Sequence, residues 1–174
     1  MVSLVHMMTR ETLAARVGAE LIERGERLAV AESSTGGLVS SMLTDVPGSS
    51  SYFDRAVVSY SNTAKVESLG VRPQTLIAHG AVSEPTAREM ALGVCDRSGT
   101  DWGLSTTGIA GPGGGSPDKP TGTVYIGVAR HEGTALRALS TTHHVFSGSR
   151  EECKQQFAEQ ALSELLEQLS LTSV

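Results

Sequence analysis

A cluster of hydroxyl side chains stands where a buried strand is expected to give way to a helix. An apolar run at residues 28–31 is followed directly by residues 32–37 (ESSTGG), which include Ser33. A helix N-terminus offers unpaired N–H groups and a partial positive charge, so a serine at this turn can lie beside oxyanion-stabilising amides. The geometry is that of a nucleophile elbow, although G-x-S-x-G is absent. Ser and Thr are also the usual residues of an ordinary N-cap, which is the alternative interpretation.

A serine nucleophile needs a base, and Lys65 is the better candidate. It lies in residues 60–65 (YSNTAK), after a second apolar run at 56–60, and is expected to reach the same sheet edge as Ser33. A lysine in a dry cleft loses its proton near neutral pH because desolvation disfavours the charged form. The alternative is an ordinary solvated helix lysine. No histidine lies in a segment expected to face Ser33; the five are His6, His79, His131, His143 and His144.

A third polar segment is rich in glycine. Residues 105–115 (STTGIAGPGGG) follow an expected strand, and glycines there let backbone amides approach an anion or a flat ring. The segment is neither a Walker A loop nor a Rossmann fingerprint. A flexible surface loop is the alternative, but ligands of open α/β sheets bind at the carboxyl ends of strands. No metal-binding motif is present, so we expect neither a metal nor another cofactor.

Composition limits the class of protein. The chain has 174 residues, which predicts one domain, and a net charge of −5. The 14 Lys and Arg residues are scattered and aromatic residues make up only 4%, which disfavours nucleic acid as a partner. No apolar run is long enough to span a membrane and no secretory signal is recognisable, so we expect a cytoplasmic protein. Cys95 and Cys153 are expected to be buried thiols.

Strands alternating with helices predict a layered α/β domain. We expect Thr9 to cap the first helix, Asn62 to cap the third and Ser83 to cap the fourth. The fold class is a single α/β/α domain with a mixed, mostly parallel sheet and a C-terminal β-hairpin plus helix, formed by residues 10–172 after an N-terminal extension at 1–9. Expected helices are 10–24, 35–44, 63–69, one from 84 and one from 149; expected strands are 28–31, 56–60, 101–107, 123–129 and 136–146.

Four segments resemble the CinA C-terminal domain family. They are residues 31–37 (AESSTGG), 58–65 (VSYSNTAK), 80–84 (GAVSE) and 107–114 (TGIAGPGG). The resemblance runs in order from about residue 10 to 170. The four motifs at consistent spacing together identify the family specifically, whereas any one of them alone does not.

The resemblance implies an activity, because stand-alone members of the family include nicotinamide-nucleotide amidohydrolase. The reaction is hydrolysis of the carboxamide of nicotinamide mononucleotide to nicotinic acid mononucleotide and ammonia, with a Ser–Lys pair and no metal. By motif position Ser33 is the nucleophile, Lys65 the base and Tyr60 a further site residue. We expect the oxyanion to meet amides at the start of the 35–44 helix, with Thr107 beside them. The expected substrate-binding residues are Ser34, Thr35, Gly36, Asn62, Thr107, Gly108, Gly111 and Arg150.

Two departures from the family pattern bear on this expectation. Ser34 stands where the family usually has Cys, and residues 148–150 (GSR) stand where it tends to have Gly-Asp-Arg. Arg150 remains the candidate for the substrate phosphate, with Lys154 as a second, less directional cation. The alternative function is a catalytically weak nucleotide-sensing or partner-binding module. We also expect a homo-oligomer whose only other partner is the small-molecule substrate.

Overall fold

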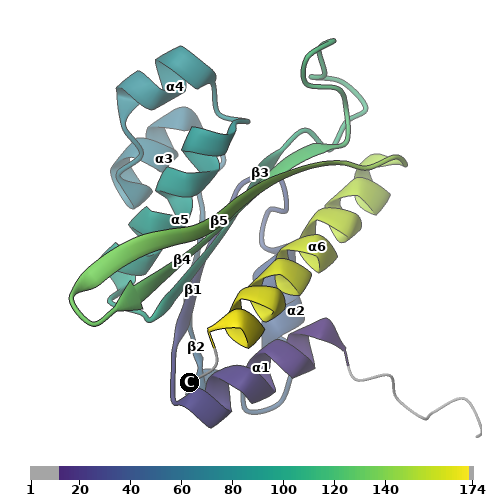
Figure 1. Cartoon of the computed structure of the whole chain (residues 1–174). Helices are drawn as coiled ribbons and strands as arrows, with labels where there is room; N and C mark the ends of the chain where they lie inside the picture. Colours follow the sequence, from purple (N-terminus) through teal and green to yellow (C-terminus); the bar gives the residue numbers. More distant parts are fainter. Residues whose placement is uncertain (1–11, 173–174) are drawn as a thin grey trace, which may run out of the picture.

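A mixed sheet lies between two layers of helices in the computed structural model, which describes residues 12–172 (Figure 1). The five strands run in the order β2-β1-β3-β4-β5. Strands β1 (Leu28–Glu32), β2 (Phe53–Val58) and β3 (Trp102–Gly108) are mutually parallel where they pair. Strands β4 (Thr123–Glu132) and β5 (Ala135–Val145) complete the sheet as an antiparallel hairpin. The predicted fold class is confirmed.

Three helices cover each face of the sheet (Figure 1). On one face lie α1 (Leu13–Arg24), α2 (Leu38–Thr44) and α6 (Arg150–Leu171), and on the other α3 (Asn62–Leu69), α4 (Pro73–His79) and α5 (Glu84–Ser98). Helix α4 was not predicted. A short 3-10 turn at Ser49–Ser51 precedes β2.

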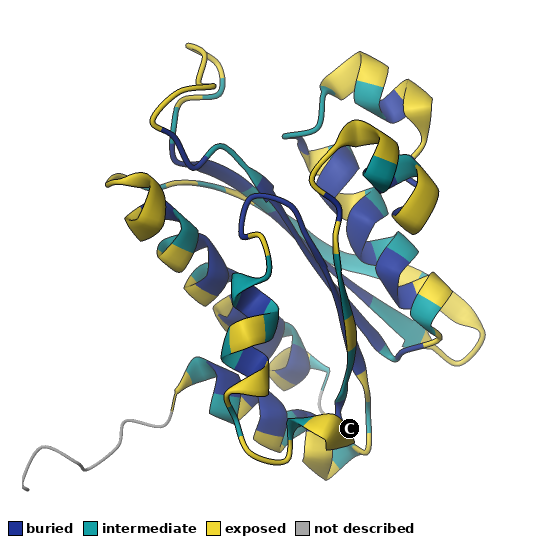
Figure 2. Cartoon of the chain, turned by 180° about the vertical axis from the view of Figure 1, so that it is seen from behind, coloured by how far each residue is buried: buried dark blue, intermediate teal, exposed yellow. Residues whose placement is uncertain are grey.

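The largest core cluster lies between the sheet and the layer formed by α1, α2 and α6. The predicted apolar face of α6 is confirmed, because Phe157, Leu162 and Leu165 are fully buried with their neighbours on that face. On α1, Val17 and Leu21 are buried, but Ile22 is half-exposed because it lies off the buried stripe. Figure 2 shows buried residues through the sheet and exposed ones on the outer helix surfaces. Both cysteines are free and buried, as predicted.

The N-caps of α1 and α3 and the first residue of α2 differ from the prediction. The Thr12 side chain accepts the Ala15 N–H and caps α1, while Thr9 lies outside the described residues. Ser61, not Asn62, accepts the Ala64 N–H and caps α3. Helix α2 begins at Leu38, three residues later than predicted.

Strand β2 is less buried than predicted. It lies at the edge of the sheet, and Val58 near its end is 50% exposed. An edge strand has a neighbouring strand on one side only, so an apolar sequence does not by itself predict that the strand is buried. None of the described helices is both long and apolar enough to cross a membrane.

Candidate functional site

The carboxyl ends of β1, β2 and β3 meet at one edge of the sheet. Directly after β1, the Ser33 N–H donates to the Thr106 carbonyl of β3 at 3.0 Å. After β2, the Ser59 N–H donates to the Glu32 carbonyl at 2.8 Å. The turn that carries Ser33 is therefore held between its two neighbouring strands, and the segment leading to α3 starts beside it.

Ser33 and Lys65 are in direct contact. The Lys65 Nζ lies 3.0 Å from the Ser33 Oγ and donates to the Ser59 carbonyl at 2.8 Å. Lys65 comes from α3 and its side chain is only 1% exposed, so the lysine points into the protein and not into solvent. The expectation that Lys65 reaches the same sheet edge as Ser33 agrees with this geometry.

Burial changes the acidity of this lysine. Desolvation lowers the pKa of Lys65 to about 8, because the charged form is disfavoured away from water. Within residues 12–172, Lys65 has no carboxylate partner that would restore the charged form. A lysine with such a pKa is neutral in an appreciable fraction of molecules near neutral pH and can accept the Ser33 proton.

A pocket of about 290 Å³ opens over the pair. Eight of the predicted site residues line it: Ser33, Ser34, Tyr60, Lys65, Thr107, Gly108, Gly111 and Arg150. The prediction missed Ala81 and Val82, which also line it. They lie in the segment 80–84 that carried part of the family resemblance, and this was the one signal that could have found them.

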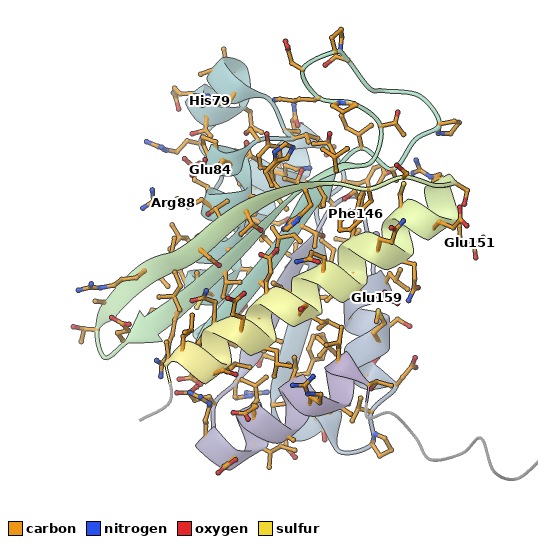
Figure 3. The ribbon with its side chains drawn as sticks, turned by 45° about the vertical axis from the view of Figure 1, so that its right-hand side comes forward. His79, Glu84, Arg88, Phe146, Glu151 and Glu159 are labelled. Atoms are coloured by element: carbon orange, nitrogen blue, oxygen red, sulfur yellow. The ribbon has the colours of Figure 1, made fainter. Side chains whose placement is uncertain are left out.

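Arg150 forms a wall shared with a second pocket. Its guanidinium donates to the Gly111 carbonyl at 2.7 Å and to the Tyr60 hydroxyl at 2.9 Å. The second pocket, of about 570 Å³, is lined by Arg150 and also by Lys154 and Glu151. Figure 3 labels Glu151 on the first turn of α6, at the end of the molecule where the loop after β3 also lies. Two adjoining pockets therefore meet at the start of α6.

The predicted oxyanion donors are wrong in part. At the start of α2, the N–H groups of Gly37, Val39 and Ser40 all donate to the Glu32 carboxylate, at 2.9, 3.1 and 2.9 Å. These groups are therefore not available to a substrate. The Thr107 hydroxyl donates to the Ala81 carbonyl at 2.7 Å, so its hydrogen is also engaged. The sequence did not reveal this because a carboxylate's direction does not follow from its position.

Other donors remain open in the same turn. Within the described residues, the backbone N–H groups of Ser34 and Thr35 have no acceptor. The buried Ser34 Oγ likewise has no hydrogen-bond partner there, and it belongs to a residue that lines the first pocket. The group that follows the nucleophile in the chain is thus free to meet an oxyanion.

Three predicted substrate contacts lie apart from the first pocket. Asn62 is exposed at the start of α3 and lines neither pocket. Thr35 and Gly36 line the second pocket, but the Thr35 hydroxyl is buried between Glu32 and Thr106, at 2.6 and 2.8 Å. The structure therefore does not bring Asn62 to the site, and Thr35 can offer only its backbone. In residues 12–172 no three His, Cys, Asp or Glu side chains gather as a metal site.

Comparison with known proteins gives one consistent family. The family model described as "CinA C-terminal domain" matches residues 10–169. A CinA-like protein of Chlorobium limicola is 56% identical over 153 residues, which are 88% of this chain and 36% of that protein. A CinA-like protein of Chlorobaculum tepidum is 52% identical over 165 residues, covering 95% and 39%. The chain thus spans less than half the length of these curated relatives.

Solved structures show the same architecture. A CinA superfamily protein from Klebsiella pneumoniae is 35% identical with a TM-score of 0.84, and the match covers 91% of this chain and 96% of that one. The competence/damage inducible protein CihA from Agrobacterium tumefaciens is 39% identical with a TM-score of 0.82, covering 91% and 93%. The likeness extends over nearly the whole of each of these chains.

Proposed function

Since the chain belongs to the CinA C-terminal domain family, we propose that it hydrolyses the carboxamide of nicotinamide mononucleotide to nicotinic acid mononucleotide and ammonia. The observation that supports this most is the 3.0 Å contact between the Ser33 Oγ and a buried Lys65 with a lowered pKa, at the floor of a pocket. A hydroxyl and a base at hydrogen-bond distance are the signature of an activated nucleophile.

The reaction proceeds in two halves. Neutral Lys65 accepts the Ser33 proton as Oγ attacks the amide carbon, and a tetrahedral intermediate forms. Lys65 then gives this proton to the departing nitrogen, the C–N bond breaks, and ammonia leaves an acyl-Ser33 ester. Water attacks the ester while Lys65 again accepts and returns a proton, which releases the acid and restores Ser33.

Stabilisation of the oxyanion comes from the turn that carries Ser33. The N–H of Ser34, a residue that lines the first pocket, has no acceptor among the described residues, and neither has the N–H of Thr35, the next residue of the same turn. Donors of this kind act in the transition state, and loss of one commonly lowers the rate by about 10²–10³. Because they belong to the backbone, they cannot be removed by changing a side chain.

The two pockets suit the two ends of the substrate. The first, at about 290 Å³, is smaller than most sites for a whole drug-sized ligand and suits the pyridine ring with its amide. The second carries Arg150 and Lys154, whose charges have no carboxylate partner within the described residues and suit the phosphate. The pyridinium charge beside Lys65 lowers its pKa further and makes the amide carbon more electrophilic.

The test is ammonia release from nicotinamide mononucleotide, with product quantified separately by chromatography. Ser33→Ala and Lys65→Met are expected to lose at least about 10³-fold in kcat/KM. Glu164→Gln serves as a control, because Glu164 is a buried acid of α6 that lines neither pocket. A wild-type rate equal to that of Ser33→Ala rejects the amidohydrolase, and binding without turnover supports the nucleotide-sensing alternative.

A further inference from the structure

We propose that Glu32 is the positioning residue of this site, with its carboxylate fixing the turn that holds Ser33 in its reactive geometry. The inference rests on the proposed function for its chemistry but assigns a role to a residue outside the pocket wall. Glu32 is the last residue of β1, directly before Ser33, and it is fully buried.

The Glu32 carboxylate collects donors from one short stretch of chain. One oxygen, Oε2, accepts from the Thr35 hydroxyl at 2.6 Å and from the N–H groups of Gly37 and Val39 at 2.9 and 3.1 Å. The other, Oε1, accepts from the N–H and the hydroxyl of Ser40 at 2.9 and 2.8 Å. A single side chain thus binds four residues between the end of β1 and the first turn of α2.

This arrangement suits a carboxylate. Three of the donors are backbone N–H groups, which can only donate, and a carboxylate accepts at both of its oxygens. Among the described residues no Lys, Arg or His makes an ion pair with Glu32. Burying a charge without a cation is costly, so hydrogen bonds and the positive end of α2 must compensate for it. The other buried acid among residues 12–172, Glu164, has His144 at 2.6 Å.

The same residue connects the turn to the base. The backbone carbonyl of Glu32 accepts the Ser59 N–H, and the Ser59 carbonyl accepts the Lys65 Nζ, both at 2.8 Å. On the other side, the Thr106 hydroxyl donates to the Thr35 hydroxyl at 2.8 Å, because the Thr35 hydrogen points to Glu32. The side chain and the backbone of Glu32 therefore act on both partners of the reactive pair.

The contacts also determine which amides remain for catalysis. Glu32 engages the N–H groups that begin α2, while those of Ser34 and Thr35 have no acceptor within residues 12–172. Without the carboxylate, the first turn of α2 would lose its acceptors and the chain around Ser33 could rotate. The consequence is loss of alignment between the nucleophile, its base and the free amides.

Two substitutions probe the contact without changing the pocket wall. Glu32→Gln has nearly the same shape, but its amide NH₂ must face an N–H donor at one of the two oxygen positions. Ser40→Ala removes one donor to Oε1 and leaves the carboxylate in place. Glu164→Gln is the matched control, a buried acid with its own hydrogen bonds to Thr142 and His144 and no contact with either pocket.

The assay is the rate at which a fluorophosphonate labels Ser33, followed by intact mass and peptide mapping. The Ser33 oxygen forms a bond to phosphorus, fluoride leaves, and Lys65 takes the hydroxyl proton, so the rate reports alignment without any nucleotide. We expect Glu32→Gln to slow labelling about tenfold or more and Ser40→Ala about two- to fivefold, with Glu164→Gln within twofold of the wild type. In nicotinamide mononucleotide hydrolysis, Glu32→Gln should lower kcat with little change in KM.

The outcomes separate this inference from the proposed function. Labelling of the wild type at Ser33 without hydrolysis of the mononucleotide would refute the substrate, while the variants still test Glu32. Labelling of Glu32→Gln within twofold of the wild type overturns the inference, as does a wild type that is not labelled at Ser33. If Glu32→Gln does not fold, the labelling rate of Ser40→Ala decides. Slower labelling together with faster hydrogen exchange at the Val39 amide supports the inference, and an unchanged labelling rate overturns it.

Discussion

Raising the pH from 6 to 9 is expected to raise kcat/KM for nicotinamide mononucleotide steeply. The base is the neutral form of Lys65, and burial lowers its pKa from 10.5 to about 8. The neutral fraction is then about 0.01 at pH 6, about 0.09 at pH 7 and about 0.5 at pH 8. The rate should therefore rise about tenfold from pH 6 to 7, about fivefold from 7 to 8, and level off above about pH 9.

The substrate itself should shift this profile. A profile of kcat/KM reports the free enzyme, and a profile of kcat reports the complex. Since the pyridinium of the bound mononucleotide is a positive charge near Lys65, the midpoint in kcat should lie below the midpoint in kcat/KM. An uncharged amide substrate would lack this difference.

The assay is product formation measured by chromatography across pH 6–10, with enzyme-free blanks at each pH. Lys154→Met is the matched control, because Lys154 lines the second pocket and not the first. It should keep the shape of the profile. A profile that is flat, or that falls between pH 6 and 8, would refute Lys65 as the base.

Three further predictions follow from named contacts. Lys65→Met should leave the free energy of unfolding at pH 7 unchanged. Burial of the protonated lysine destabilises the folded wild type by up to about 3 kcal/mol, and removing this penalty offsets the loss of the hydrogen bonds to Ser33 and Ser59. This penalty fades between pH 8 and 10.5, so the free energy of unfolding of the wild type should rise over that range relative to that of Lys65→Met. Urea unfolding at several pH values measures both, and a difference between them that does not change with pH would contradict the prediction. Gly108→Ala should lower the melting temperature and the activity together, because a Cβ there lies 2.5 Å from the Thr123 carbonyl oxygen and 3.1 Å from the Ser34 Oγ; wild-type values for both would refute the close packing. Arg150→Lys should raise KM for the mononucleotide about tenfold, with little change for the nucleoside that lacks the phosphate, because a lysine cannot replace the bidentate guanidinium; equal changes for both compounds would exclude a phosphate contact.

Residues that follow parallel strands could be placed from the sequence. Ser33 and Lys65 each come after an apolar run, and parallel strands end at the same sheet edge, so their approach followed from topology. The apolar face of α6 was predicted from its period for a similar reason, since packing requires one continuous stripe.

What could not be predicted depends on where side chains point. The start of α2 is set by the Glu32 carboxylate, which reaches forward to Ser40, and no local propensity encodes that contact. The exposure of Val58 depends on strand order, which places β2 at the edge. Asn62 was predicted to cap α3, but Ser61 is an equally good capping residue, and only the structure shows that the Ser61 hydroxyl accepts the free N–H.

The central claim is that Ser33 becomes acylated during turnover. The most direct measurement is peptide mass analysis of enzyme mixed with excess nicotinamide mononucleotide and quenched in acid within the first turnovers. We expect an adduct on Ser33 equal in mass to the substrate less ammonia, present in the wild type and lost in Ser33→Ala. Product formed in the same samples with no adduct on Ser33, or with the adduct on Ser34, would contradict it.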